Sequence, residues 1–261
     1  MDISLEVVPR SREALDEALD LARRYPDIHT INIPDLSRFP LRAWDACRSL
    51  GMAQREAAEA APQAQALAPA YSFIPHLRAN AFNPKEPLPF AALFHKAGIT
   101  AVLALAGDPP ADPSQPCHDY PTCDFIRDLK AQIPGVAVYA AFDPYRNNIR
   151  YELDYLAQKE AAGADGFFSQ PFFDLRLLEI YAEYLEHRKV WWGVAPVVSE
   201  RSKAYWESRN RAIFPRSFRA DLEWNVSFAR DVRAFCAAND FNFYLMPIKV
   251  DLDAYLGGLF A

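Results

Sequence analysis

Eight short apolar segments, separated by stretches with helical periodicity, set the strongest limit on the fold of this chain. The apolar segments lie at residues 3–8, 28–33, 72–76, 101–106, 136–142, 165–170, 190–196 and 241–246. Successive segments start about 25 to 50 residues apart, which leaves room for a helix in each crossover and favours parallel strands. Eight such units in 261 residues predict an α/β fold, a single (β/α)8 TIM barrel over residues 1–261.

Several predicted strands are apolar at nearly every position, as expected for strands covered on both faces. Residues 100–107 read TAVLALAG and residues 136–142 read VAVYAAF. An open, doubly wound sheet is the alternative architecture. Its dinucleotide-binding form is disfavoured because none of the nine glycines falls in a GxGxxG pattern.

Charge and cysteine content exclude several classes of protein. The chain has 28 Lys and Arg against 34 Asp and Glu, a net charge of −6 without long runs of one sign, so we expect no nucleic-acid partner. No apolar stretch is long enough to span a bilayer. Four cysteines at irregular spacing are typical of a reduced, cytoplasmic protein. Cys117, His118 and Cys123 lack the spacing of a zinc site, so we predict no metal.

Polar residues gather at the ends of the predicted strands, where the βα loops of a barrel build the active site. Glu6 interrupts the first strand, His76 ends the third and Asp108 follows the fourth. Arg146 follows the fifth strand, and Gln170 ends the sixth. This placement predicts that these side chains serve one site.

The two acids in this set each have a structural alternative. A carboxylate inside the apolar run SLEVV is costly unless it faces a polar cavity or has a partner, so Glu6 is either functional or bonded to backbone or arginine. Asp108 either caps a turn or stands in the site. Its place at a strand end favours the functional role, and the neighbouring prolines would hold its loop rigid.

Seven segments carry a further pattern, in this order along the chain: SLEVVPR at 4–10, IPHL at 74–77, LALAGDPP at 103–110, VYAAFDP at 138–144, KEAAGADGFFSQPFFD at 159–174, GVAPV at 193–197 and DFNFYLM at 240–246. Together they resemble the methylenetetrahydrofolate reductase family. The resemblance implies a barrel in which FAD passes hydride from NAD(P)H to 5,10-methylenetetrahydrofolate, yielding 5-methyltetrahydrofolate. Tetrahydrofolate derivatives are then the expected partners. An apolar helix face at 175–185 is compatible with a homo-oligomer.

The resemblance also implies roles for individual residues. Glu6 matches the acid that assists opening of the methylene bridge, Asp108 the acid near flavin and folate, and Gln170 the amide that binds the pterin. Tyr244, on the last predicted strand, is expected to reach the substrate. The chemistry agrees, since ring opening needs a proton donor and a pterin edge needs a group that donates and accepts. The positions that match flavin contacts are His76, Gly107, Asp108, Tyr120, Ala140, Phe142, Arg146 and Lys159.

The side of the site expected to meet the flavin phosphates departs from the family pattern. Ala106 stands where the family has arginine, and Arg146 where it has histidine. On the following helix only Lys159 matches the family's Asp, Asn, Arg and Lys; the other three positions hold Glu152, Tyr155 and Gln158. A diphosphate needs cations or backbone N–H donors. We therefore predict that FAD binds with Arg146 and Lys159 carrying more of the diphosphate charge.

Three other functions remain open at this point. They are a folate reductase without flavin, a folate-binding subunit without catalysis, and a barrel aldolase that uses Lys249 as a Schiff-base nucleophile. The basic segment at 199–219 is either a solvated surface or a lid over the folate tail. The choice between NADH and NADPH and the direction of the reaction are also open.

Overall fold

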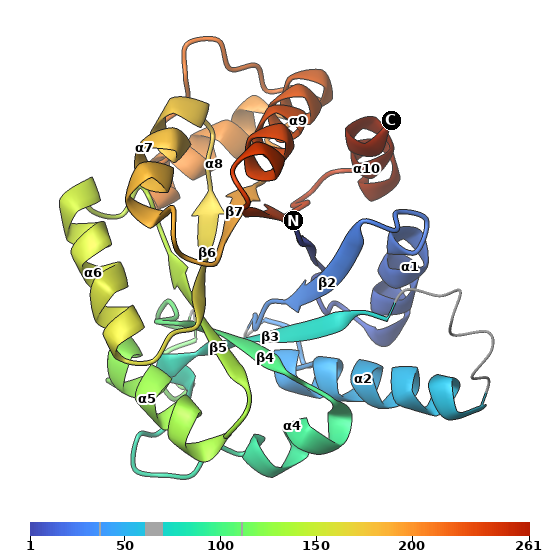
Figure 1. Ribbon diagram of the computed structural model, residues 1–261, viewed down its shortest axis with the longest axis vertical. Coiled ribbons are helices and arrows are strands. Elements are labelled where there is room, and N and C mark those ends of the chain that lie inside the picture. The colour runs from blue at the N-terminus through green and yellow to red at the C-terminus, as the bar shows by residue number, and fades with distance from the viewer. Residues whose placement is uncertain (37, 61–69, 111) are drawn as a thin grey trace. The chain divides into compact units, whose positions relative to one another are not determined.

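The computed structural model describes residues 1–36, 38–60, 70–110 and 112–261. Its eight strands follow one another in a closed barrel of order β1 to β8, and this confirms the predicted (β/α)8 TIM barrel. The strands are β1 (Ile3–Glu6), β2 (Ile28–Ile33), β3 (Ser72–Arg78), β4 (Ala101–Leu105), β5 (Ala137–Phe142), β6 (Gly166–Pro171), β7 (Val190–Val194) and β8 (Asn242–Leu245), and Figure 1 labels β2 to β7.

Helices follow the strands along the chain. They are α1 (Arg12–Ala22), α2 (Ala43–Ala60), α4 (Ala91–Ala97), α5 (Thr122–Gln132), α6 (Ile149–Ala161), α7 (Leu175–Leu185), α8 (Glu200–Asn210), α9 (Leu222–Ala238) and α10 (Leu252–Phe260), with a short 3-10 helix, η1 (Ala79–Ala81). Helix α4 begins only at Ala91, after Pro87 and Pro89, because proline lacks the N–H that a helix interior needs. None of the helices described is long and apolar enough to cross a membrane.

The described chain divides into two compact units. Unit 1 comprises Met1–Glu6, Phe142–Leu156 and Phe167–Ala261. Its sheet runs β6-β7-β8-β1 with every pair parallel. Helix α9 lies against α10 and against β8, as Figure 1 shows. Because these strands are parallel, the carboxyl ends of β1, β6 and β8 meet at one edge of the sheet.

Unit 2 comprises Val7–Ala141 and Ala157–Gly166. Its sheet runs β2-β3-β4-β5, again with every pair parallel. Helix α2 packs on β3 and on α4. The strands are buried at nearly every position, as the continuous apolar runs in the sequence predicted.

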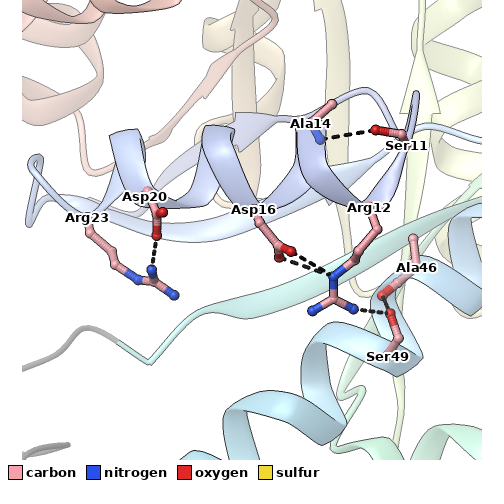
Figure 2. Close-up of polar contacts among 8 residues, drawn as sticks. All are labelled: Ser11, Arg12, Ala14, Asp16, Asp20, Arg23, Ala46 and Ser49. Atoms are coloured by element: carbon pink, nitrogen blue, oxygen red, sulfur yellow. Dashed lines mark hydrogen bonds and ion pairs between the residues drawn. The ribbon is translucent and has the colours of Figure 1, made fainter.

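Helix α1 illustrates how local sequence sets an element and its neighbour (Figure 2). Ser11 precedes the helix, and its Oγ accepts a hydrogen bond from Ala14 N at 3.2 Å, which satisfies one of the free N–H groups of the first turn. Arg12 Nε pairs with Asp16 at 3.1 Å, and Arg12 Nη1 donates to Ser49 Oγ on α2 at 2.9 Å. These exposed contacts align α1 with α2 and contribute little to stability.

Candidate functional site

Glu6 and Tyr244 form the central polar contact of unit 1. Glu6 is the last residue of β1, and the Tyr244 hydroxyl on β8 donates a hydrogen bond to Glu6 Oε2. In the β1–β8 register Tyr244 lies opposite Ser4, and Ser4 lies two residues before Glu6 on β1. Side chains two residues apart on a strand share a face, so the sheet brings together two residues that the sequence analysis placed in the substrate site.

Burial controls the charge of this pair. It raises the pKa of Glu6 from 4.5 to about 7, and the hydrogen bond from Tyr244 lowers it by less. Burial and the neighbouring carboxyl group both raise the pKa of Tyr244. Glu6 is therefore a carboxyl group that exchanges its proton near neutral pH, which is the property of a general acid.

An aromatic stack holds the tyrosine in place. The edge of the Tyr244 ring meets Phe168 with ring centres 5.2 Å apart, and Phe168 stacks on Trp191 at 4.4 Å. Trp191 Nε1 in turn donates to Asp2 Oδ2 at 3.1 Å. Each ring is fixed by the next, so the phenol that bonds Glu6 has little freedom to leave it.

A bulge in β6 presents Gln170. Between Phe168 and Pro171 the strand carries one more residue than β7 does between Trp191 and Gly193, and such bulges re-aim side chains next to active sites. Gln170 is exposed while the rest of β6 is buried. Gly193 is required here, because a Cβ atom would lie 2.5 Å from Met246 Cε and 2.7 Å from the backbone oxygen of Ser169.

His76 is the buried polar residue of β3 in unit 2. Its Nε2 lies 3.1 Å from Asn32 Oδ1 on β2. Burial lowers the pKa of His76 to about 3, so the imidazole is neutral at physiological pH. It offers an uncharged contact to a ligand and carries no countercharge for a phosphate.

The loop after β4 carries Asp108 and depends on Gly107. Gly107 has a φ of +83°, and a Cβ atom there would lie 2.2 Å from Asn80 Oδ1. Asn80 Nδ2 donates to the Asp108 carbonyl at 2.9 Å. Gly107 and Asn80 thus fix the loop that presents the exposed Asp108.

Two of the expected cofactor contacts in unit 2 have structural partners. The Tyr120 hydroxyl donates to Asp128. Lys159 is buried, and its Nζ donates to the Ala141 carbonyl at 2.7 Å. The expectation that Lys159 carries diphosphate charge stays a prediction, and the burial of its ammonium group on this carbonyl works against it. Ala140 is also fully buried.

The remaining two expected cofactor contacts lie in unit 1. The Phe142 ring is buried, with ring centres 6.4 Å from Phe172, 5.8 Å from Tyr181 and 5.9 Å from Trp192. Because the ring is enclosed, a ligand could contact Phe142 through its backbone and not through its ring. Arg146 is exposed.

Sequence reasoning missed a buried charge cluster in unit 2. Asp35 Oδ2 accepts from Arg42 Nη2 at 2.6 Å and from Arg78 Nε at 3.0 Å. Asp35 follows β2 and Arg78 ends β3, so both occupy the strand ends where the other candidates were sought. The signal available in the sequence was Arg78, a charged residue two positions after His76 on the same predicted strand.

Two other expectations concern metal and Schiff-base chemistry. Within the described ranges, no group of three His, Cys, Asp or Glu side chains is arranged to hold a metal ion. Lys249 is exposed in the segment after β8. An exposed lysine lacks the apolar or cationic surroundings that activate a Schiff-base amine.

Residues 53–201, more than half of the chain, match the family model of methylenetetrahydrofolate reductase. The chain belongs to the methylenetetrahydrofolate reductase family. The matched span contains His76, Asp108 and Gln170, whereas Glu6 and Tyr244 lie outside it. No curated protein sequence matches the chain closely enough to be counted as a relative.

Solved structures similar to this member of the reductase family share its fold at low identity. 2,3-Dimethylmalate lyase, a PEP mutase/isocitrate lyase superfamily member, has a TM-score of 0.55 at 10% identity over 96% of this chain and 75% of its own. Oxaloacetate acetylhydrolase has a TM-score of 0.54 at 10% identity over 99% and 77%. At this identity the likeness shows the barrel alone.

The raised pKa of Glu6 makes stability depend on pH. The folded state holds this proton up to about pH 7, whereas an unfolded glutamate releases it near 4.5. The free energy of unfolding of the wild type, compared with that of Glu6→Gln, should therefore be highest below pH 4.5. It should fall by up to about 3 kcal/mol as the pH rises to 7. Urea unfolding between pH 4.5 and 8 measures this, with Glu183→Gln on α7 as the control for loss of one charge. Parallel curves for wild type and Glu6→Gln would contradict the assignment.

Proposed function

We propose that this chain interconverts 5,10-methylenetetrahydrofolate and 5-methyltetrahydrofolate with NAD(P)H as the electron donor. The observation that carries the proposal is the Glu6–Tyr244 pair at the carboxyl end of β1, with a Glu6 pKa of about 7. Family membership supplies the substrate class, and the pair supplies a proton donor of the kind that the reaction needs.

The proposed reaction needs one proton and one hydride. Protonated Glu6 gives its proton to a nitrogen of the five-membered ring, the adjacent carbon–nitrogen bond breaks, and an iminium carbon forms. Hydride from NAD(P)H adds to that carbon and leaves a methyl group. Gln170, exposed at the end of β6, has the amide donor and acceptor that a pterin edge requires. Tyr244 keeps the Glu6 carboxyl group oriented.

FAD is the hydride carrier that the family uses, but the residues on α6 do not fit its diphosphate. Glu152 is buried and brings a carboxylate that accepts from Asp143 N at 3.4 Å. Lys159 is buried on the Ala141 carbonyl. This observation favours the second candidate function, a folate reductase in which nicotinamide donates hydride directly. The roles of Glu6 and Gln170 are the same in both cases.

The absorption spectrum of the purified protein distinguishes the two candidates. A direct nicotinamide reductase should be colourless between about 350 and 500 nm, should not take up FAD, and should oxidise NAD(P)H with methylenetetrahydrofolate. A yellow protein that bleaches on addition of NAD(P)H would restore flavin as the carrier.

Replacing Glu6 tests the proton donor. Glu6→Gln keeps size and hydrogen bonding but removes the proton, so folate turnover should fall by about 10²- to 10⁴-fold. In the wild type, turnover should decrease as pH rises above about 7, because Glu6 then loses its proton. Steady-state rates between pH 5.5 and 9 measure both effects. Normal turnover by Glu6→Gln would remove the residue from this role.

Replacing Gln170 tests the pterin contact. Gln170→Ala should weaken folate binding by roughly 1–3 kcal/mol, because it leaves polar atoms of the pterin unpaired. Gln158→Ala removes an exposed amide from α6 and should leave folate affinity unchanged. Calorimetric titration with 5-methyltetrahydrofolate compares the two variants. Tight folate binding by the wild type without any turnover would indicate a folate-binding subunit instead.

A further inference from the structure

A cavity of about 750 Å³ opens in unit 2 among the segments that follow β2, β3 and β4. We call it the arginine pocket. The lining residues that matter for its chemistry are Arg42, Trp44, Arg78, Asn80, Glu86 and His118. Four prolines and Phe82 complete its apolar wall. Concave, mostly apolar surfaces with a few polar groups are typical of small-molecule sites.

The pocket carries an excess of buried positive charge. Arg42 and Arg78 both bond the same oxygen of Asp35, at 2.6 and 3.0 Å, so two guanidinium groups share one carboxylate. The Arg78 side chain is only 13% exposed, and a buried charge in excess is costly without a counterion. The bond from Arg78 uses Nε and leaves both Nη nitrogens for an oxyanion.

Two contacts pre-orient the guanidinium groups. The Arg42 group lies over the Trp44 ring, 4.5 Å from its centre, and Trp44 packs on Phe82 and Phe90 with ring centres 5.5 Å away in each case. Asp35 Oδ1 also meets Ala43 N at 3.5 Å. The arginines are thus held by packing and by a shared carboxylate, which lowers the entropic cost of binding an anion.

Asp45 lies close enough to Arg42 to act on its charge, and Glu86 is the acidic residue that lines the pocket. It is exposed and accepts from Asn83 Nδ2 at 2.7 Å. Charges in solvent are screened far more than charges inside the protein, so the more deeply buried Arg78 dominates the local field.

Asn80 fixes one wall of the pocket. It holds the segment after β4 through four bonds, from its N to Ala106 O, from His118 N to its O, from its Nδ2 to Asp108 O, and from its Nδ2 to Cys117 Sγ. Its Oδ1 is buried and accepts no hydrogen bond from any part of the chain that the structure describes. This oxygen is packed against Gly107, so Asn80 contributes to the pocket by fixing its wall and leaves the binding of an anion to the arginines.

We infer that the arginine pocket binds a small aromatic ligand bearing an oxyanion, a phosphate or a carboxylate, with the oxyanion on Arg78 and Arg42. The inference goes beyond the proposed function and does not depend on turnover. ADP is a probe with an aromatic ring and phosphate groups, and p-aminobenzoylglutamate is a probe with an aromatic ring and carboxylate groups. Inorganic phosphate tests the oxyanion without the ring.

Calorimetric titration with each of the three probes tests the site. ADP or p-aminobenzoylglutamate should bind the wild type, and Arg78→Met should weaken that binding at least tenfold. Arg127→Met, which removes an exposed arginine paired with Asp124 on α5, should bind as the wild type does. Binding of ADP alone identifies phosphate as the source, binding of p-aminobenzoylglutamate alone identifies carboxylate, and both support the shared chemistry. Phosphate as the sole binder would overturn the aromatic part of the inference.

A measurement on the wild type covers the case in which Arg78→Met does not fold. Phenylglyoxal modifies accessible arginines, and mass spectrometry locates the modified sites. The probe that binds should protect Arg42, whose side chain is 31% exposed, and leave Arg127 reactive. Absence of binding by all three probes at millimolar concentration, equal affinity in Arg78→Met, or an unprotected Arg42 would each overturn the inference. If the probes bind and protect as expected but the protein does not turn over folate, the proposed function fails and this inference stands.

Discussion

Parallel pairing of the strands is the constraint on which the rest of the structure depends. Because each crossover returns the chain through a helix, the carboxyl ends of paired strands meet at one edge of their sheet. In unit 1 this edge carries Glu6 on β1, Gln170 on β6 and Tyr244 on β8. Close strand packing at Gly193, where no Cβ fits, keeps β6 and β7 in the register that turns Gln170 outward.

The two units treat a carboxyl group at a strand end in opposite ways. Glu6 is bonded by a neutral phenol, and burial raises its pKa to about 7. Asp35 is buried with two arginines on one of its oxygens. The first arrangement favours a proton that comes and goes near neutral pH. The second favours a permanent charge and leaves one cation in excess, which suits a group that binds an anion.

Much of the fold was predictable from the sequence, because strands covered on both faces read as continuous apolar runs. Glu6 and Gln170 were predictable as polar residues at strand ends. The β6 bulge was not, since one extra residue shows only in the register between strands. The bond between Lys159 and the Ala141 carbonyl was not predictable either, because a lysine on a helix gives no sign in the sequence that its ammonium group bonds a backbone oxygen. Asp35, Arg42 and Arg78 meet only through tertiary structure.

Glu6 keeps its proton up to about pH 7, because burial raises its pKa to about that value. Carbon-13 NMR of protein labelled at glutamate carboxyl carbons, with Glu6→Gln used to assign the signal, measures this directly. We expect a titration midpoint near pH 7, and a higher midpoint in Tyr244→Phe, because the tyrosine hydrogen bond lowers the pKa of Glu6. A midpoint near 4.5, the ordinary value for glutamate, would contradict it.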